Sequence, residues 1–581
     1  MRKEWRTIAN GTGNPNLAPS GNAVAPTPTR LWFALTFNCN HHLLLAYLVH
    51  PAHHLIMLTR KASAQTLPPD ILREILDHAA AAEPAGFDCD SMRYKLGWIA
   101  TTHVCRHWRY VGLGAAPLWA EAVCAFPDDV VAERLVERTR ACPLNLNVFH
   151  DANDAKQRRN RRGPRLGWSL KYIHRARYLR CTIPPSALLH GHPEVKALFA
   201  TSLSILKNTV IKVDGYTRDV PLLTVALEAP VLEFADFTGF LPSPKSLLPE
   251  LRYLWLRLLG STTADGPMDQ LLDLLRTLPR LKYLELQLPA RNAKPAVNRK
   301  AVHLEHLDYV KVRCGSIHSL DLVELISAPT LESLEIETSG GLSGEFLERV
   351  IALQQHRFHL MNQVLSISET HLFLSDTTSG WQRLCIEFPK SYGGMSFVEL
   401  VSTLHRYFDI SSYRHCALVV PRPLNSWEKP LYEGLHTAIA ALGRAMTGVT
   451  TLNLHGMVQP DVLSLLQPTD ENPGPMLFPA LYTLSLGAVD PNPYSIYRPY
   501  LVARAEEMSQ WCDILRDVLA GRLRKGSGIS CLMLEGNNCT REECTRIWTE
   551  RAQAYLGEGL VSEVDDQREF ISSCYVCSGR D

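Results

Sequence analysis

The stretch Leu251-Arg252-Tyr253-Leu254-Trp255-Leu256 decides the predicted fold, because it follows the pattern L-x-x-L-x-L. The final L-x-L repeats with a period of two, which is typical of a strand with one buried face. Close copies begin at Leu281, Leu331 and Leu481, and looser copies begin at Leu232, Leu304, Trp381, Val449 and Ile529. A proline lies just upstream of several copies, at Pro230, Pro249, Pro279, Pro329 and Pro479. The recurrence predicts a series of similar strands.

Helical patterns lie between these copies. The expected helices cover residues 268–278, 320–327, 397–408, 435–446 and 512–523. A strand followed by a helix, repeated along the chain, is the unit of a leucine-rich-repeat solenoid. We therefore expect an α/β fold in which residues 127–560 form an irregular solenoid of this kind. A generic α/β domain whose parallel strands are rich in leucine is the alternative.

In such repeats the leucines face the core, and the residues between them form an exposed strip. The expected strip contains Tyr253, Trp255, Arg257, Tyr283, Glu285, Gln287, His306, Asp308, Ser333, Glu335 and Glu337. Tyrosine, tryptophan and arginine dominate the energies of protein interfaces. We therefore predict a target-binding surface that contains Tyr253, Trp255, Arg257 and Tyr283. The alternative is that a loop covers Trp255.

Residues 67–123 have the pattern of three short helices. The first opens at Leu67-Pro68-Pro69-Asp70, where proline fits the first helical turn. Its apolar residues Ile71, Leu72, Ile75, Leu76 and Ala79 share one face. A second helical pattern covers 96–108, and a third runs from 117 to 123. So small a module gains stability by packing on a partner. A helical cap on the following domain is the alternative.

Four pieces of this module resemble a known family. They are 67–75 (LPPDILREI), 96–99 (LGWI), 102–109 (THVCRHWR) and 117–119 (PLW). In order and spacing they resemble the F-box of mushroom-type fungal F-box proteins, although the spacer 83–93 is longer than in a generic F-box. The resemblance implies docking to a Skp-type adaptor and, through it, to a cullin scaffold and a ubiquitin-conjugating enzyme. It assigns contact or core positions to Leu67, Pro68, Ile71, Ile75, Val104, Cys105, Trp108, Leu118 and Trp119. F-box proteins also commonly carry leucine-rich repeats after the F-box.

The composition is that of an ordinary globular protein, with 46% hydrophobic and 20% charged residues. Sixty Lys and Arg residues against 59 Asp and Glu residues leave a formal charge of +1. Nothing global therefore favours nucleic acid or an anionic membrane as a partner. Fifteen scattered cysteines, with no secretory signal before them, favour a reducing compartment. We expect an intracellular protein of the cytoplasm, the nucleus or both.

The N-terminal segment 1–60 is expected to be a poorly ordered leader. Its most apolar part, 31–58, is interrupted by Asn, His, Thr and Pro, and the longest clean run is 43–49. A membrane-spanning helix needs about 20 predominantly apolar residues, so we expect no membrane anchor. The remaining parts are the helical module at 61–126, the solenoid at 127–560 and a tail at 561–581.

Sequence motifs for catalysis were not found: no phosphate-binding loop, dinucleotide fingerprint, nucleophile elbow or zinc-protease helix occurs in a fitting context. Cys574 and Cys577 lack the second pair that a structural zinc site needs. The histidine group at 41–54 lies in the expected leader. The basic run 156–162 fits a nuclear import signal or a phosphate contact, and also a plain solvated loop.

We therefore expect no catalytic residue, no metal and no cofactor. The predicted function is that of a substrate receptor, which links a protein target to a Skp–cullin–F-box ubiquitin ligase. A repeat scaffold outside any ligase is the main alternative, and an enzyme that uses an unrecognised Cys/His pair is a second.

Overall fold

The structure is a computed structural model. It describes residues 67–88, 91–149, 164–213, 223–258, 266–288, 300–314, 319–338, 343–357, 364–368, 370–375, 382–387, 396–407, 409–420, 434–455, 460–468, 475–487, 500–535, 537–539, 542–567 and 569–571. The chain divides into two compact units. The helical unit contains the described residues 67–84 and 96–115, and the sheet unit contains those of 85–95 and from 116 onward. The expected leader, the basic run 156–162 and the Cys574–Cys577 pair lie outside the described residues.

The helical unit consists of α3 (Pro69–Ala82), the 3₁₀ helix η2 (Gly97–His103) and α4 (Arg106–Gly114). The expected single helix over 96–108 is wrong, because Cys105 is extended (φ −158°, ψ 174°) between η2 and α4. Thr101 and Thr102 donate their hydroxyls to the carbonyls of Trp98 and Ile99. Such local side-chain bonds compete with regular helix formation.

Both ends of α3 are fastened within this unit. At its C-terminal end, the backbone N–H of Trp98 donates to the Glu83 carbonyl over 2.9 Å. Gly97 permits this approach with φ +53°, because a Cβ there would lie 2.3 Å from the Glu83 oxygen. At the other end, Nε2 of His107 donates to the Leu67 carbonyl over 2.8 Å.

The sheet unit opens with an antiparallel hairpin and two helices. The hairpin pairs β1 (Gly86–Asp88) with β2 (Arg93–Lys95). The helices are α5 (Ala116–Ala122) and α6 (Asp129–Thr139), which pack against each other. The Asp128 carboxylate caps α6 by accepting from the backbone N–H groups of Val130 and Val131. The helix expected at 117–123 corresponds to α5, which belongs to the sheet unit and not to the helical unit.

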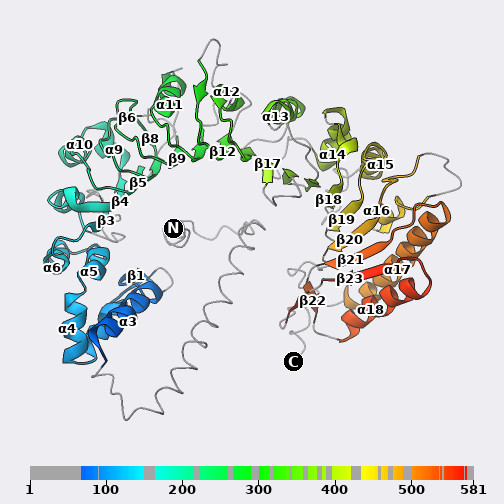
Figure 1. Cartoon of the computed structure of the whole chain (residues 1–581), viewed down its shortest axis with the longest axis horizontal. Helices are drawn as coiled ribbons and strands as arrows, with labels where there is room; N and C mark the ends of the chain where they lie inside the picture. Colours follow the sequence, from blue (N-terminus) through cyan, green and yellow to red (C-terminus); the bar gives the residue numbers. More distant parts are fainter. Residues whose placement is uncertain are drawn as a thin grey trace. The chain divides into compact units, whose positions relative to one another are not determined.

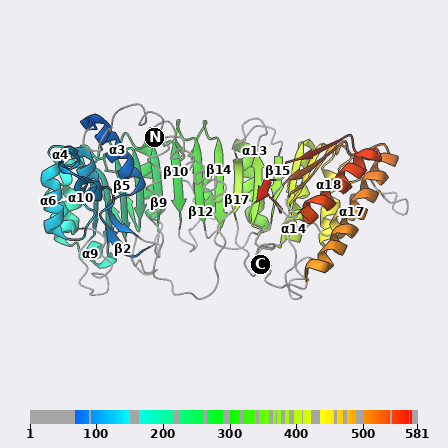
Figure 2. The same ribbon diagram turned by 90° about the horizontal axis from the view of Figure 1, so that it is seen from below.

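A sixteen-stranded sheet forms the body of this unit. In spatial order its strands are β3 (Leu144–Phe149), β4 (Ala176–Ile183), β5 (Asn208–Val213), β7 (Phe234–Thr238), β9 (Tyr253–Arg257), β10 (Tyr283–Gln287), β12 (Tyr309–Cys314), β14 (Ser333–Thr338), β17 (Gln382–Glu387), β16 (His371–Ser375), β15 (Val364–Ile367), β18 (His415–Val419), β19 (Thr451–His455), β20 (Thr483–Gly487), β21 (Cys531–Glu535) and β23 (Glu563–Asp566). Figure 2 shows β9, β10, β12, β14 and β17 side by side. Neighbours are parallel except at β16, which is antiparallel to both β15 and β17.

Helices and short strand pairs fill the connections. The helices are α8 (Leu166–Ser169), η3 (Ile173–Arg175), α9 (Pro185–Leu189), α10 (Pro193–Ala200), α11 (Gly266–Arg276), α12 (Leu320–Leu325), α13 (Gly344–Arg357), α14 (Phe397–Tyr407), η5 (Ile410–Ser412), α15 (Leu435–Ala445), α16 (Pro460–Ser464), α17 (Tyr500–Arg524) and α18 (Glu542–Gly557). The short parallel pairs are β6 (Leu223–Val225) with β8 (Phe240–Pro242), β11 (Val302–His303) with β13 (Ile326–Ser327), and β22 (Asn537–Cys539) with β24 (Glu569–Ile571). Within the described part of the chain, no helix is both long and apolar enough to cross a membrane.

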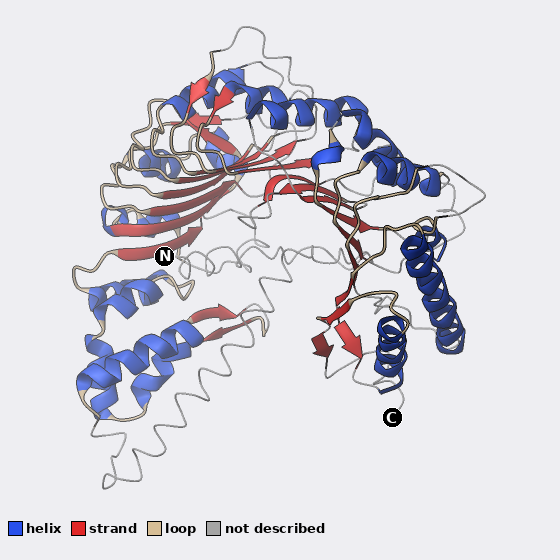
Figure 3. Cartoon of the chain, turned by 45° about the vertical axis from the view of Figure 1, so that its right-hand side comes forward, coloured by secondary structure: helices blue, strands red, loops and turns tan. Residues whose placement is uncertain are grey.

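The core of the sheet unit lies between the strands and the helices. Helices α10 to α15 lie along one side of the sheet (Figures 1 and 3). Leu254 and Leu256 of β9 are fully buried, and they are in register with Leu284 and Leu286 of β10. The predicted α/β class is therefore confirmed. The strand residues between these core positions point to the opposite side of the sheet, which we call the open face.

One predicted strand was placed in the wrong frame. In β12, Val310 and Val312 pair with Leu284 and Leu286, so the pattern begins at Leu307 and not at Leu304. Both leucines are buried and three residues apart, so either fits the first position of the pattern. His306 and Asp308 consequently precede the strand.

Candidate interaction surfaces

The open face between β7 and β14 presents three residues from each strand, in register across the sheet. The first row contains Phe234, Tyr253, Tyr283, Tyr309 and Ser333, the second Asp236, Trp255, Glu285, Lys311 and Glu335, and the third Thr238, Arg257, Gln287, Arg313 and Glu337. The four predicted target-binding residues, Tyr253, Trp255, Arg257 and Tyr283, thus lie on two adjacent strands of one face. Sequence reasoning missed Tyr309, Lys311 and Arg313 because of the frame error at Leu304.

Five rings form a continuous aromatic group on this face, which we call the aromatic row: Phe234, Tyr253, Trp255, Tyr283 and Tyr309. The rings of Tyr283 and Tyr309 are stacked, and Trp255 lies 6.3 Å from Tyr283 and 5.3 Å from Phe234, centroid to centroid. Only Phe234 is buried, while the other four rings are half-buried. Their accessible edges provide a rigid apolar platform with phenol groups at its margin.

Two phenols of the aromatic row, those of Tyr283 and Tyr309, are held in the neutral form. Burial raises the pKa of Tyr283 and of Tyr309 far above the usual value. The carboxylates of Glu285 and Glu335 act in the same direction. Both phenols therefore keep their protons at physiological pH, and that of Tyr283 donates to the Glu285 carboxylate over 3.4 Å.

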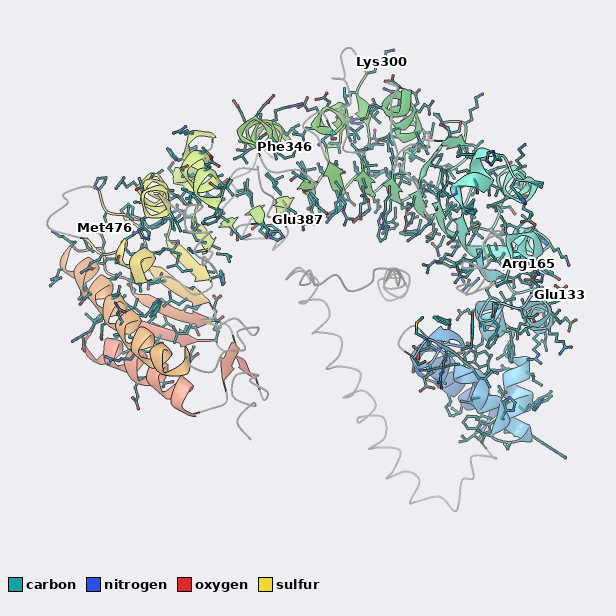
Figure 4. The ribbon with its side chains drawn as sticks, turned by 180° about the vertical axis from the view of Figure 1, so that it is seen from behind. Glu133, Arg165, Lys300, Phe346, Glu387 and Met476 are labelled. Carbon is teal, nitrogen blue, oxygen red and sulfur yellow. The ribbon has the colours of Figure 1, made fainter. Side chains whose placement is uncertain are left out.

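Beside the aromatic row lies a set of ion pairs, which we call the paired cluster: Glu285, Lys311, Arg313, Glu335 and Glu337. Lys311 Nζ lies 2.7 Å from Glu335, and Arg313 Nε lies 2.7 Å from Glu337. Burial alone would lower the pKa of Lys311, but the pairing with Glu335 outweighs burial and raises it. Figure 4 shows the two sides of the sheet farther along the chain. Glu387 of β17 points away from the helices, on the same side as the paired cluster, and Phe346 of α13 lies on the helix side.

The second candidate surface belongs to the helical unit. Of the positions that the F-box resemblance singles out, Pro68, Ile71 and Val104 are exposed, and Leu67, Ile75, Cys105 and Trp108 are half-buried. Leu96, Tyr110 and Leu113 are further exposed apolar residues of this unit that the resemblance did not single out. Trp98 is buried, together with Leu72 and Leu76. The helical unit therefore has buried apolar residues and still exposes several large apolar side chains.

Leu118 and Trp119 are placed differently from the rest of that set. Both are buried in the sheet unit, where α5 packs against α6 and β3. The Arg138 guanidinium lies over the Trp119 ring, 4.7 Å from its centroid. In this conformation the two residues are core positions, so the docking surface considered below omits them.

Four buried cysteines have thiols that burial disfavours as nucleophiles. Burial raises the pKa of Cys124, Cys181 and Cys416 to about 12, and it raises that of Cys385 further. A catalytic thiol needs the opposite shift. Among the described residues, no three His, Cys, Asp or Glu side chains are grouped as ligands for a metal ion.

Comparisons with known proteins identify no family: no protein-family model matches the chain, and no curated protein matches it at a significant level.

Proposed function

We propose that this chain is an interaction protein with two separate binding surfaces. More specifically, we propose that it is an F-box type substrate receptor, whose helical unit docks to a Skp-type adaptor of a cullin-based ubiquitin ligase. The open face of its sheet, in an irregular leucine-rich-repeat solenoid, holds the target protein.

The exposed apolar side chains of the helical unit are the observation that carries this proposal. Ile71 is 42% exposed and Val104 is 60% exposed, and both match positions of the F-box motif. Ile71 and Ile75 lie one turn apart, on the same side of α3. The bond from His107 to Leu67 holds the start of α3 against α4, so two pieces of the motif are neighbours. Several large apolar side chains left exposed on one small unit favour a protein partner.

The repeated strand supports the solenoid part of the proposal. β7, β9, β10, β12 and β14 are consecutive in the sheet, parallel and in register, and their core positions are Leu, Val, Ile, Ala or Phe. α11 connects β9 to β10 with a buried face that includes Leu271 and Leu275. The antiparallel β16 interrupts the series, so the solenoid is irregular.

Such a receptor acts by proximity. Tethering the target beside a ubiquitin-conjugating enzyme replaces a collision in solution by an encounter within one complex, at effective concentrations of about millimolar for short connections. In this proposal the chain contributes binding and positioning, and the ubiquitin-conjugating enzyme supplies the chemistry.

Co-purification of the full-length chain with a Skp-type adaptor tests the proposal. The double variant Ile71→Asp/Val104→Asp places charges on exposed positions and is expected to reduce adaptor recovery at least about tenfold. The matched control Val130→Asp alters an exposed valine of α6 in the sheet unit and should leave recovery unchanged. Circular dichroism confirms that each variant is folded.

Two results would contradict the adaptor assignment. One is undiminished recovery of the adaptor by the folded double variant. The other is the absence of adaptor binding by the wild-type chain, which would favour the repeat scaffold. The triple variant Leu67→Ala/Pro68→Ala/Trp108→Ala provides an independent version, in which apolar contact is removed without adding charge.

A further inference from the structure

A second group of charges on the open face differs from the paired cluster. It consists of Arg180 on β4, Lys212 on β5, Asp236 and Thr238 on β7 and Arg257 on β9, and we call it the basic cluster. Lys212, Thr238 and Arg257 are in register in one row, and Arg180 and Asp236 belong to the row beside it. Among the described residues, Lys212 and Arg257 share one carboxylate, Asp236, so these three side chains carry a net charge of +1 (2 − 1).

The Asp236 carboxylate lies at the outer limit of ion pairing from both Lys212 and Arg257. Lys212 Nζ lies 3.7 Å and Arg257 Nη2 lies 3.9 Å from the same oxygen, Oδ2 of Asp236. Charge-assisted hydrogen bonds between such groups are about 2.7–2.9 Å long. Burial lowers the pKa of Lys212, and the neighbouring Arg257 and Arg180 add to the shift against the opposing effect of Asp236.

Three buried polar atoms of the cluster have no hydrogen-bond partner among the residues that the structure describes. They are Oδ1 of Asp236, in a residue only 4% exposed, Oγ1 of Thr238, in a residue 8% exposed, and Nε of Arg257. Native proteins rarely leave buried polar atoms unsatisfied unless a ligand or solvent completes them. The side chains of Lys212 and Arg257 remain 19% and 26% exposed, so a ligand has access to the cluster from solvent.

The paired cluster, two strands away, provides an internal comparison. There two cations face three carboxylates, a net charge of −1 (2 − 3), and both cations have a carboxylate oxygen at 2.7 Å. Lys311 and Arg313 therefore each have a carboxylate oxygen of their own at short distance, whereas Lys212 and Arg257 share one oxygen at 3.7 and 3.9 Å.

We propose that the basic cluster is a binding site for the anionic oxygens of a target, supplied by a carboxylate or by a phosphate group. Lys212, Arg257 and the Thr238 hydroxyl donate to the anion. Asp236 Oδ1 accepts from a donor on the same ligand, such as a main-chain N–H. Because Trp255 is the register partner of Asp236, the aromatic row begins beside the site. A preferred target thus presents an acidic group next to an apolar one.

This inference deepens the proposed function, since it assumes that the open face holds the target. Anion binding itself does not depend on adaptor docking, and the two are measured separately. Loss of adaptor recovery with intact anion binding would refute only the ligase assignment, and the converse would refute only the anion site.

Titration of the full-length chain with inorganic phosphate, followed by calorimetry at fixed ionic strength, tests the site. The wild-type chain is expected to bind one equivalent, and Lys212→Met/Arg257→Met should weaken binding at least about tenfold. The matched control Lys311→Met removes a paired cation from the same face and should leave phosphate affinity within about twofold. Titration with acetate distinguishes the two sources: binding comparable to phosphate indicates a carboxylate site, and much weaker binding indicates a phosphate site.

The variant Asp236→Asn keeps the proposal testable if the double variant does not fold. It removes the negative charge that Lys212 and Arg257 share, so phosphate affinity should increase several-fold. Failure of the wild-type chain to bind either anion would overturn the proposal, as would equal phosphate affinity in the wild type, Asp236→Asn and a folded double variant.

Discussion

The rings of Tyr283 and Tyr309 are stacked on neighbouring parallel strands, with centroids 4.4 Å apart and planes within 8° of each other. Direct register between β10 and β12 produces this stacking, because each tyrosine is the first residue of its strand. Tyr253 of β9 is in register with Tyr283 and therefore lies in the same row. The aromatic platform therefore forms because a tyrosine occupies the first position of three neighbouring strands, β9, β10 and β12.

Removal of the Trp255 ring should weaken target binding. Trp255→Ala deletes a ring that contacts both Phe234 and Tyr283, and central tryptophans commonly contribute about 2 kcal/mol or more to an interface. Target proteins recovered by affinity capture and quantified by mass spectrometry should fall at least about tenfold, while adaptor recovery is unchanged. Tyr482→Ala, at an exposed tyrosine outside the aromatic row, is the control. Unchanged recovery of every captured target by Trp255→Ala would refute this surface.

Gly97→Ala should destabilise the helical unit. The new Cβ would lie 2.3 Å from the Glu83 oxygen, at a backbone φ of +53°, and such strain costs about 1–3 kcal/mol. Gly114→Ala is the matched control, since nothing lies within 4 Å of its Cβ position, and its effect should stay under about 1 kcal/mol. Amide exchange of residues 69–82 and 97–114 measures the difference. Equal exchange rates in both variants would show that the close approach of Gly97 to Glu83 is not required.

Acidification should destabilise the sheet unit through His371 and His415. Burial lowers the pKa of both imidazoles below the usual 6.5; at His371 Glu387 opposes the shift and Lys311 adds to it. The unfolded chain therefore binds more protons than the folded chain below about pH 6.5, so stability falls as the pH is lowered through this region.

The urea midpoint of unfolding, compared at pH 7.5 and pH 5.5, measures this effect. The double variant His371→Gln/His415→Gln should show a smaller loss of stability on acidification than the wild type. His436→Gln, at an exposed histidine of α15, should behave as the wild type does. An identical pH dependence in all three proteins would exclude the two half-buried histidines as its source.

Cys124, Cys181 and Cys416 should resist alkylation in the folded chain. Their pKa values are raised to about 12 by burial, so the reactive thiolate is scarce at pH 7.5. Iodoacetamide labelling followed by peptide mass spectrometry should modify them only after addition of denaturant. Rapid labelling of any one of them in the native protein would instead revive the hypothesis of a cysteine enzyme.

The strand positions were predictable wherever the pattern L-x-x-L-x-L is intact. β9, β10, β14 and β20 lie where the sequence pattern places them. β3 and β4 were missed because they alternate apolar residues, as in Leu144, Leu146 and Val148, without the leading leucine. β5 was missed because a threonine, Thr209, occupies the first core position after Leu206. The antiparallel direction of β16 was also not predictable, since alternation alone does not encode strand direction.

The predicted target-binding residues and the basic cluster differ in how far the sequence predicts them. Tyr253, Trp255, Arg257 and Tyr283 were predictable because they lie inside two intact copies of the pattern. The basic cluster was not, because Arg180, Lys212, Asp236 and Arg257 come from four strands and meet only through the register of the sheet. In the helical unit, the exposure of Tyr110 and Leu113 depends on the break at Cys105, which the periodicity of residues 96–108 conceals.

Hydrogen–deuterium exchange of the full-length chain, with and without a saturating Skp-type adaptor, tests the central claim most directly. The proposed docking predicts slower exchange in residues 67–84 and 96–115, and unchanged exchange in β9, β10 and β12. Unchanged exchange in the helical unit, or slowing confined to the sheet unit, would contradict the assignment of this chain as an F-box type receptor.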